Sequence, residues 1–408
     1  MIPHSFTLVA LGLFAASLSA ERAAPFSLSV GTQSIGAKYK FTEDSLLVES
    51  AKQMAALGSD TLKIALTPKY EDDYMMTHDP EIDSVLDLAL RKPGFHEVMD
   101  MPFRNIMLWV YPFSDSRDAF FKGVFSEADA QGIYEEMYAL TVHILERYSG
   151  SGKSFFLGNW EGDWHVQSER YDYEADPRPE VIAASIEWFR MREKAIADAR
   201  RDTPHHDVEV YYYIELNHVR KSMDRGKPSI VNKILPYIKT DFVSWSSYDV
   251  TKPAVLMEDE AKGRERVFQA LDYIEAHLPE SDIPGKRVFV GEYGFELMSF
   301  PDRELQSKYT AQIMKWSLEW GCPFVLYWEL YCNEVTDAGE HRGYWLIDDR
   351  GDKQPVWFFH KEFLDRANAF VENYQKEHGK LPDQQVYNRE AASWIQKFST
   401  YDVEDHHE

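Results

Sequence analysis

The sequence predicts an α/β protein folded as one (β/α)8 barrel, the TIM barrel, in which eight parallel strands are each followed by a helix. Short runs of β-branched and aromatic residues alternate with longer amphipathic stretches from residue 27 onward. Eight such pairs can be counted. A doubly wound open sheet is the competing architecture, but residues 30–36 lack the G-x-G-x-x-G turn that it would place after its first strand.

The expected elements follow in regular order. The strands are predicted at 27–32, 60–66, 105–113, 154–161, 208–216, 241–249, 287–294 and 324–331. The helices are predicted at 43–57, 81–91, 126–148, 179–200, 229–238, 258–278, 302–320 and 355–376. No Pro- or Ser-rich linker divides them, so a single domain is expected over 25–378, followed by a polar, frayed tail at 379–408.

The N-terminus has the pattern of a secretory signal peptide over residues 1–20. Residues 6–18 form an apolar run, and the small residues Ser17, Ser19 and Ala20 follow as a possible cleavage site. The run falls short of the roughly 20 apolar residues that a membrane-spanning helix needs. We therefore expect a secreted or periplasmic protein without stable membrane insertion after signal cleavage.

Composition narrows the possible partners. The formal net charge of −24 opposes binding to a phosphate backbone, so nucleic acid is not an expected partner. The 11 Trp and 23 Tyr residues supply flat faces that suit sugar rings. No His-x-His ends the first strand and no H-E-x-x-H occurs, so the sequence gives no reason to expect a metal or another cofactor.

A second possibility, a nucleotide enzyme, is suggested by Gly152-Lys153-Ser154, which resembles the end of a phosphate-binding loop. The full motif needs a glycine at position 147, where this chain has Arg147. It must also open a helix, whereas Lys153-Ser154 ends a loop and begins an expected strand. We interpret the segment as a surface turn.

Two glutamates end apolar strands. Glu161 ends the fourth expected strand and Glu292 ends the seventh. An acid at the end of an apolar strand costs desolvation unless it is paired, solvated or used, and in a barrel the strand ends carry the chemistry. Glycoside hydrolysis needs such a pair, one carboxyl as acid and one as nucleophile or base. For either glutamate alone, a salt bridge or a cap would be the simpler interpretation.

The strand-end motifs Gly291-Glu292-Tyr293-Gly294 and Asn159-Trp160-Glu161 resemble those of clan A of the retaining glycoside hydrolases. The resemblance spans roughly residues 27–376. It implies that Glu292 is the nucleophile and Glu161 the general acid/base.

The chain departs from the clan at two positions. Trp160 separates Asn159 from Glu161, which are adjacent in the clan, and Lys63 stands where the clan usually has an Arg near the nucleophile. If the fourth strand stays regular, Asn159 and Glu161 point to the same side. Asp163 remains the alternative acid.

Sugar contacts are expected from residues near the strand ends. The resemblance places Lys63, Tyr248 and Trp328 at the second, sixth and eighth strands. Glu215 and Asn217 at the end of the fifth strand, and Glu329 at the end of the eighth, are expected to contact sugar hydroxyls or to make structural hydrogen bonds. The candidate substrate-binding residues are Asn159, Lys63, Trp164, Asn217, Tyr248, Trp328 and Glu329.

Together these features predict a secreted retaining glycoside hydrolase that cleaves O-glycosidic bonds of a poly- or oligosaccharide by double displacement. Two alternatives stay open. The altered Asn-Trp-Glu order and Lys63 are compatible with a catalytically inactive, carbohydrate-binding barrel, and a transglycosylase would use the same catalytic residues. The sequence determines neither the sugar, nor the linkage, nor endo against exo action.

Overall fold

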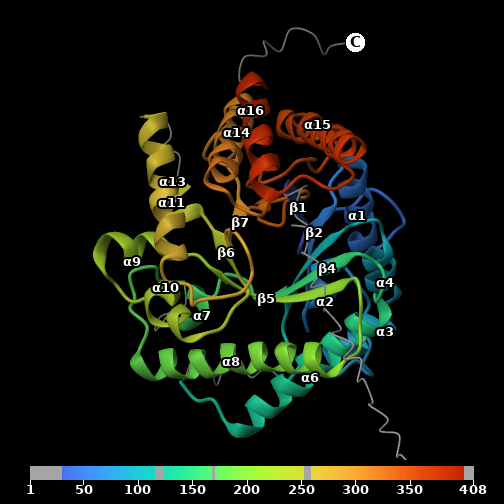
Figure 1. The fold of residues 1–408 in the computed structure, drawn as a ribbon, viewed down its shortest axis with the longest axis vertical. Coiled ribbons are helices and arrows are strands. Elements are labelled where there is room, and N and C mark those ends of the chain that lie inside the picture. The colour runs from blue at the N-terminus through green and yellow to red at the C-terminus, as the bar shows by residue number, and fades with distance from the viewer. Residues whose placement is uncertain (1–29, 115–122, 168–170, 252–258, 399–408) are drawn as a thin grey trace, which may run out of the picture.

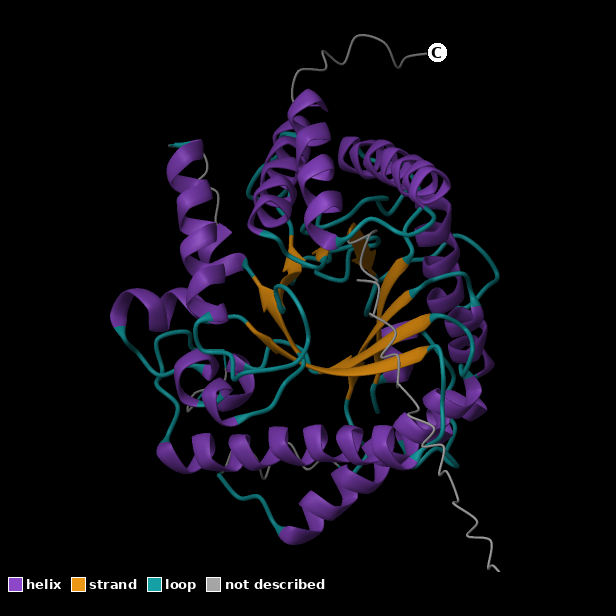
Figure 2. Cartoon of the chain, viewed as in Figure 1, coloured by secondary structure: helices purple, strands orange, loops and turns teal. Residues whose placement is uncertain are grey.

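Eight parallel strands close into a barrel in chain order, β1 to β8, which confirms the predicted (β/α)8 fold. The computed structural model describes residues 30–114, 123–167, 171–251 and 259–398, so the expected signal peptide lies outside the described residues. Figure 2 shows the ring of strands inside the layer of helices. The strands are β1 (Val30–Gln33), β2 (Thr61–Leu66), β3 (Asn105–Val110), β4 (Lys153–Gly158), β5 (Val208–Leu216), β6 (Phe242–Ser246), β7 (Val288–Tyr293) and β8 (Val325–Tyr327).

The helices surround this ring, with α6 and α8 on one side and α14 to α16 on the opposite side (Figure 1). Every expected helix is present, and the one expected at 229–238 is divided into α10 and the 3-10 helix η1. The helices are α1 (Leu46–Leu57), α2 (Tyr70–Tyr74), α3 (Val85–Arg91), α4 (Pro93–Asp100), α6 (Glu127–Arg147), α7 (Asp163–Val166), α8 (Pro179–Asp202), α9 (Val219–Arg225), α10 (Ile230–Lys233), η1 (Leu235–Tyr237), α11 (Tyr248–Thr251), α13 (Glu260–Glu275), α14 (Arg303–Trp320), α15 (Pro355–His378) and α16 (Gln384–Phe398).

Side-chain caps begin the helices where the sequence changes from loop to amphipathic pattern. Ser45 accepts the backbone N–H of Val48 at the start of α1, and Ser126 and Asp129 form a capping box at the start of α6. Gly58 ends α1 in the left-handed conformation, at φ 101°. These local signals explain why the helix starts were predictable to within a few residues.

A layer of aromatic rings fills the lower half of the barrel interior, which is the half nearer the amino ends of the strands. The ring of Phe156 lies 5.1 to 5.4 Å, centroid to centroid, from those of Tyr211, Phe242 and Phe324, and Phe289 lies 5.6 Å from Phe324. All five side chains are buried. Because side chains alternate along a strand, the positions two residues further on also face inward, toward the carboxyl ends of the strands.

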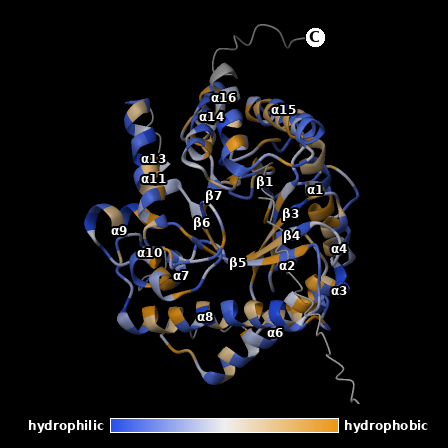
Figure 3. Ribbon diagram, in the orientation of Figure 1, coloured by the Kyte–Doolittle hydropathy of each residue, from blue (hydrophilic) through white to orange (hydrophobic). Residues whose placement is uncertain are grey.

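Helix α8 is tied to the barrel by a buried arginine. Figure 3 shows apolar and polar residues alternating along α8, as expected for a helix with one face on the core. Arg192 on its buried face is fully enclosed and donates to the carbonyl oxygens of Val110 and Gly158, each at 2.8 Å. These carbonyls end β3 and β4, so the arginine fixes the two strand ends next to the site described below.

The chain after residue 379 differs from the polar, frayed tail that the sequence predicts. Gln384–Phe398 form helix α16, which packs against α14 and α15. Tyr387, Ala391 and Ile395 recur at four-residue spacing and are buried. The composition of the segment is polar, but its few apolar residues share one face, and that spacing supports a docked helix. No helix within the described residues is long and apolar enough to cross a membrane.

Candidate active site

A cavity of about 770 Å³ opens at the carboxyl ends of the strands, where the chemistry of such barrels takes place. Both predicted catalytic glutamates line it. Six of the nine predicted site residues lie on its wall, namely Glu161, Glu292, Trp164, Asn217, Tyr248 and Trp328.

Glu161 follows β4 and is 7% exposed. Its carboxyl accepts a hydrogen bond from the indole N–H of Trp164 at 2.7 Å. Burial and the nearby charge of Glu215 raise the pKa of Glu161 to about 8, against the opposing effects of Trp164 and Lys63. Glu161 is therefore mostly protonated at neutral pH, as a general acid must be.

Glu292 lies on β7 and is 2% exposed. Its Oε1 lies 3.5 Å from the Lys63 ammonium nitrogen. Burial and the charge of Glu215 raise the pKa of Glu292 well above its ordinary value, whereas Lys63 favours the ionised form. The two glutamates thus differ in their partners: Glu161 has a neutral N–H donor, and Glu292 has a cation.

A β-bulge turns Glu292 toward the cavity. The register of β6 and β7 pairs Trp245 with Val290 and then Ser246 with Glu292, so Gly291 is one extra residue in β7. A Cβ at Gly291 would lie 1.7 Å from the Ser244 hydroxyl oxygen. The bulge therefore requires glycine at this position, because any side chain would collide with β6.

Glu215 connects the two glutamates from below. It is fully buried on β5. Its Oε2 accepts from Lys63 at 2.6 Å and from Ser244 at 2.7 Å, and its Oε1 accepts the backbone N–H of Glu161 at 3.1 Å. Of the two roles expected for Glu215, the geometry supports structural hydrogen bonds: the residue holds Lys63 beside the Glu292 carboxylate.

Lys63 does not line the cavity but lies beneath it, fully buried. Its ammonium group lies 4.4 Å from the centre of the Trp109 ring. The arginine that the clan usually carries here would offer a planar fork, whereas lysine offers a point charge. In this chain that charge is shared between Glu215 and Glu292.

Two of the predicted sugar-binding residues take structural places instead. Because β4 ends at Gly158, regular alternation does not carry Asn159 into the cavity; its side-chain amide exchanges hydrogen bonds with the backbone of Glu215 at 3.0 and 3.2 Å. Glu329 is fully buried, and its carboxylate accepts the backbone N–H of Asn333 at 2.8 Å. Neither residue lines the cavity.

Asp163, the alternative acid, is also committed to structure. Its carboxylate accepts the backbone N–H groups of Asn217, His218 and Ile230 at 2.8 to 3.1 Å. The residue is 1% exposed and is not part of the cavity wall. It orders the chain after β5, and Glu161 is the acid that reaches the cavity.

The cavity wall also contains residues that the sequence analysis did not select. His218 directly follows Asn217, and Asp249 directly follows Tyr248, so the place of each beside a selected strand-end residue was the available signal. Tyr173 and Tyr344 come from long loops and gave none. Within the described residues, no three His, Cys, Asp or Glu side chains come together as a metal site.

No protein-family model matches the chain, and no curated protein matches its sequence. Solved structures share its fold. A family 5 glycoside hydrolase (subfamily 18) from Streptomyces cattleya aligns with a TM-score of 0.56 at 12% identity, over 83% of this chain and 80% of that one. An exo-β-1,4-mannosidase from Opitutaceae bacterium strain TAV5 aligns with a TM-score of 0.55 at 15% identity, over 85% of this chain and 60% of that one.

A family 39 glycoside hydrolase from Bacteroides cellulosilyticus WH2 aligns with a TM-score of 0.53 at 12% identity, over 86% of this chain and 65% of that one. Families 5 and 39 both belong to clan A, so the resemblance stated from the sequence motifs is confirmed for the fold. At these identities the likeness establishes the barrel and not its activity.

Proposed function

We propose that the chain is a retaining glycoside hydrolase that cleaves O-glycosidic bonds of a poly- or oligosaccharide. One observation carries the proposal: Glu161 and Glu292 face the same cavity from β4 and β7, with environments that separate an acid from a nucleophile. Burial raises the pKa of both carboxyls, that of Glu161 to about 8, and the ammonium group of Lys63 lies beside Glu292, where it favours the ionised form. Carboxyls in contrasting environments are the usual basis for assigning acid and nucleophile.

In the first step the Glu292 carboxylate attacks the anomeric carbon, and Glu161 gives its proton to the glycosidic oxygen as the bond breaks. The product is a glycosyl ester on Glu292 and a free leaving group. In the second step Glu161, now ionised, removes a proton from water, which attacks the anomeric carbon and releases Glu292.

The charge balance around Lys63 supports this division of roles. Three carboxyls surround a single lysine, so burial favours retention of a proton among them. Glu215 uses both oxygens to accept donors, and Glu292 has the ammonium group nearby. The mechanism requires this proton on Glu161 and the ionised form of Glu292, which the ammonium group of Lys63 favours.

For the substrate, β-linked neutral glycosides are the first choice. The lining residues include more acids than bases, which disfavours anionic sugars. The titles of the similar structures name a Manβ1-4GlcNAc complex and an exo-β-1,4-mannosidase. Substrate tests should begin with β-mannosides and extend to β-glucosides and β-galactosides.

The test is a screen with 4-nitrophenyl β-glycosides, followed by product analysis. Proton NMR should show the β-anomer forming first, because two inversions give net retention. A 2-deoxy-2-fluoro glycoside should label the peptide that contains Glu292, as read by mass spectrometry. Inversion, or a label on another carboxyl, would disprove the mechanism.

The same screen separates the alternatives. Sugar binding without cleavage would favour the inactive, carbohydrate-binding barrel, and transfer of the glycosyl group to an added sugar would favour a transglycosylase.

We also propose secretion after cleavage near Ala20, from the apolar run at 6–18. Expression of the full chain and N-terminal sequencing of the exported protein would test it.

A further inference from the structure

A continuous row of side chains leads from Glu161 along one side of the cavity. Trp164 donates to Glu161 at 2.7 Å, and its ring lies 4.4 Å from that of His218. The His218 ring lies 4.7 Å from Tyr173, whose hydroxyl donates to Asp249 at 3.4 Å. All five residues line the cavity. The row therefore forms one wall on the side of the acid.

This wall and Asn217, the cavity residue next to His218 in the chain, carry buried polar atoms without a hydrogen-bond partner among the described residues. They are the ring Nε2 of His218, Oδ1 of Asp249 and Oδ1 of Asn217. His218 is 2% exposed. Buried polar atoms in proteins are nearly always hydrogen-bonded, so three of them on one wall mark a place built for a polar ligand.

The donors and acceptors on this wall match a sugar hydroxyl array. Gln167 donates to Nδ1 of His218 at 3.0 Å, which leaves the ring proton on Nε2 as a donor. Burial lowers the pKa of His218, which keeps the ring neutral. Burial raises the pKa of Asp249 to about 8, so at neutral pH its carboxyl carries a proton and can donate as well as accept. Oδ1 of Asn217 is an acceptor. A pyranose offers hydroxyls that both donate and accept, and Trp164 and Tyr173 offer apolar surface for its ring.

The position of the wall indicates which sugar it takes. Glu161 must protonate the glycosidic oxygen, so the departing sugar lies on the Glu161 side of the bond, and the sugar that becomes attached lies over Glu292. The row from Trp164 to Asp249 begins at Glu161.

We propose that Tyr173, His218 and Asp249 form the subsite for the leaving-group sugar, a neutral hydroxyl-bearing pyranose. The inference rests on the proposed function and adds to it the residues that select the leaving group.

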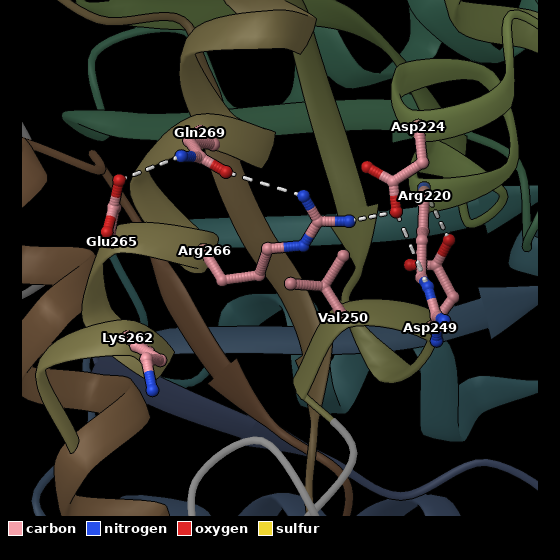
Figure 4. A pocket seen from close by; sticks show the side chains of 8 residues that line it. All are labelled: Arg220, Asp224, Asp249, Val250, Lys262, Glu265, Arg266 and Gln269. Carbon is pink, nitrogen blue, oxygen red and sulfur yellow. Dashed lines mark hydrogen bonds and ion pairs between the residues drawn. The ribbon is translucent and has the colours of Figure 1, made fainter. Parts of the chain in front are cut away.

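Asp249 also borders a second, smaller cavity of about 370 Å³ (Figure 4). Its Oδ2 accepts the backbone N–H of Arg220 at 2.7 Å. On the far side, Asp224 is paired with Arg266 and lies 3.6 Å from Arg220. Asp224 lines only this second cavity, so it is a matched control: the same residue type, beside the same arginine, outside the active-site cavity.

The experiment compares two substrates with the same non-reducing sugar: the 4-nitrophenyl β-glycoside and the β-1,4-linked disaccharide. The aryl group has no hydroxyls for Asp249 or His218 to bind. We expect Asp249→Ala, which removes the donor and the acceptor together, to lower kcat/KM on the disaccharide by about 10- to 100-fold, and on the aryl glycoside by less than about 3-fold. Asp224→Ala should change neither. Because Asp249→Ala also removes the acceptor of the Arg220 backbone N–H, thermal unfolding checks the fold of each variant.

Tyr173→Phe is the second variant and should show the same pattern with a smaller loss. Equal losses on both substrates, or none on either, would overturn the subsite while leaving the hydrolase proposal intact. If the wild type cleaves neither substrate, the proposed function fails, and calorimetric titration with the disaccharide decides the subsite. Affinity at least 10-fold weaker in Asp249→Ala supports it; unchanged affinity, or no binding by the wild type, overturns it.

Discussion

The lower half of the barrel interior, at the amino ends of the strands, is filled by apolar rings. The upper half, at the carboxyl ends of the same sheet, holds buried charged groups. Below, five aromatic rings pack against one another within 5.1 to 5.6 Å. Above, Lys63, Glu215 and Glu292 lie within ion-pair distance. On β5 the change from aromatic ring to carboxylate takes four residues, from Tyr211 to Glu215. The residues that stabilise the barrel and those that carry the chemistry therefore lie in different halves. Substitutions in the upper half should lower activity, and substitutions in the lower half should lower the free energy of unfolding.

The largest expected effect is at the upper half. Glu292→Gln should lower kcat/KM by about 10⁴-fold or more, roughly 5 kcal/mol of transition-state stabilisation, because no nucleophile remains. The melting temperature should stay the same or rise, since a buried carboxyl among like charges is removed. Steady-state kinetics and thermal unfolding of the same preparation check both. A variant that loses activity only because it unfolds would contradict the separation.

The matching substitution at the lower half is Phe156→Ala. It removes a ring that packs on three neighbours and should reduce the free energy of unfolding by about 3–5 kcal/mol. Below its melting temperature, kcat should remain close to that of the wild type. Denaturant unfolding and kinetics at low temperature measure the two effects, and Phe156→Leu should lose less stability. A large fall in kcat in the folded variant would show that the halves are coupled.

Glu215→Gln tests the boundary between the halves. We expect kcat to fall by about 10- to 100-fold, because Lys63 loses its closest carboxylate and shifts beside Glu292. Glu215 also raises the pKa of Glu292, so the acid limb of the pH profile should move to lower pH. Ser244→Ala, which removes one hydrogen bond to Glu215, should have a smaller effect in the same direction. A fall in kcat with an unmoved acid limb would indicate only a structural role.

The smallest effect is the pH dependence of the wild type. Because burial raises the pKa of Glu161 to about 8, kcat/KM should fall as pH rises through about 8 and the acid loses its proton. As the pH is lowered, activity should begin to fall while the pH is still above the ordinary glutamate range. The reason is that the pKa of Glu292 is raised and the nucleophile must be ionised. The Glu161→Gln variant can be assayed with a 2,4-dinitrophenyl glycoside, whose leaving group needs no acid. In this variant the fall in kcat/KM above pH 8 should disappear. If the fall persists, a group other than Glu161 causes it.

The barrel and the two glutamates could be predicted because both depend on local sequence signals. The strands and helices follow hydrophobic period and caps, and an acid ending an apolar strand marks a strand end that carries chemistry. The position of Asn159 depended on where β4 stops, which its sequence does not specify. Glu329 was expected in the cavity because it follows β8, but its carboxylate accepts the backbone N–H groups of Asn333, four residues on, and of Ile35, after β1. These partners come into reach only when the loops after β1 and β8 fold.

The role of Glu215 was only partly predictable for a similar reason. It has the same strand-end signal as Glu161 and Glu292, and the resemblance to the clan motifs separated those two from it, but the choice between sugar contact and structural hydrogen bonds stayed open. That choice is decided by contacts with Lys63 and Ser244, which come from other strands. The helix at 384–398 was missed because a polar composition was given more weight than the spacing of three apolar residues.

The missing side chain at Gly291 has a consequence for how this site can vary among related proteins. A Cβ there would lie 1.7 Å from the Ser244 hydroxyl and 3.1 Å from the Glu215 carboxylate. A serine at 244 is therefore compatible with nothing larger than glycine at 291. In an alignment of relatives, a larger residue at 291 should occur only where the hydroxyl at 244 is absent, whereas position 244 can change while 291 stays glycine.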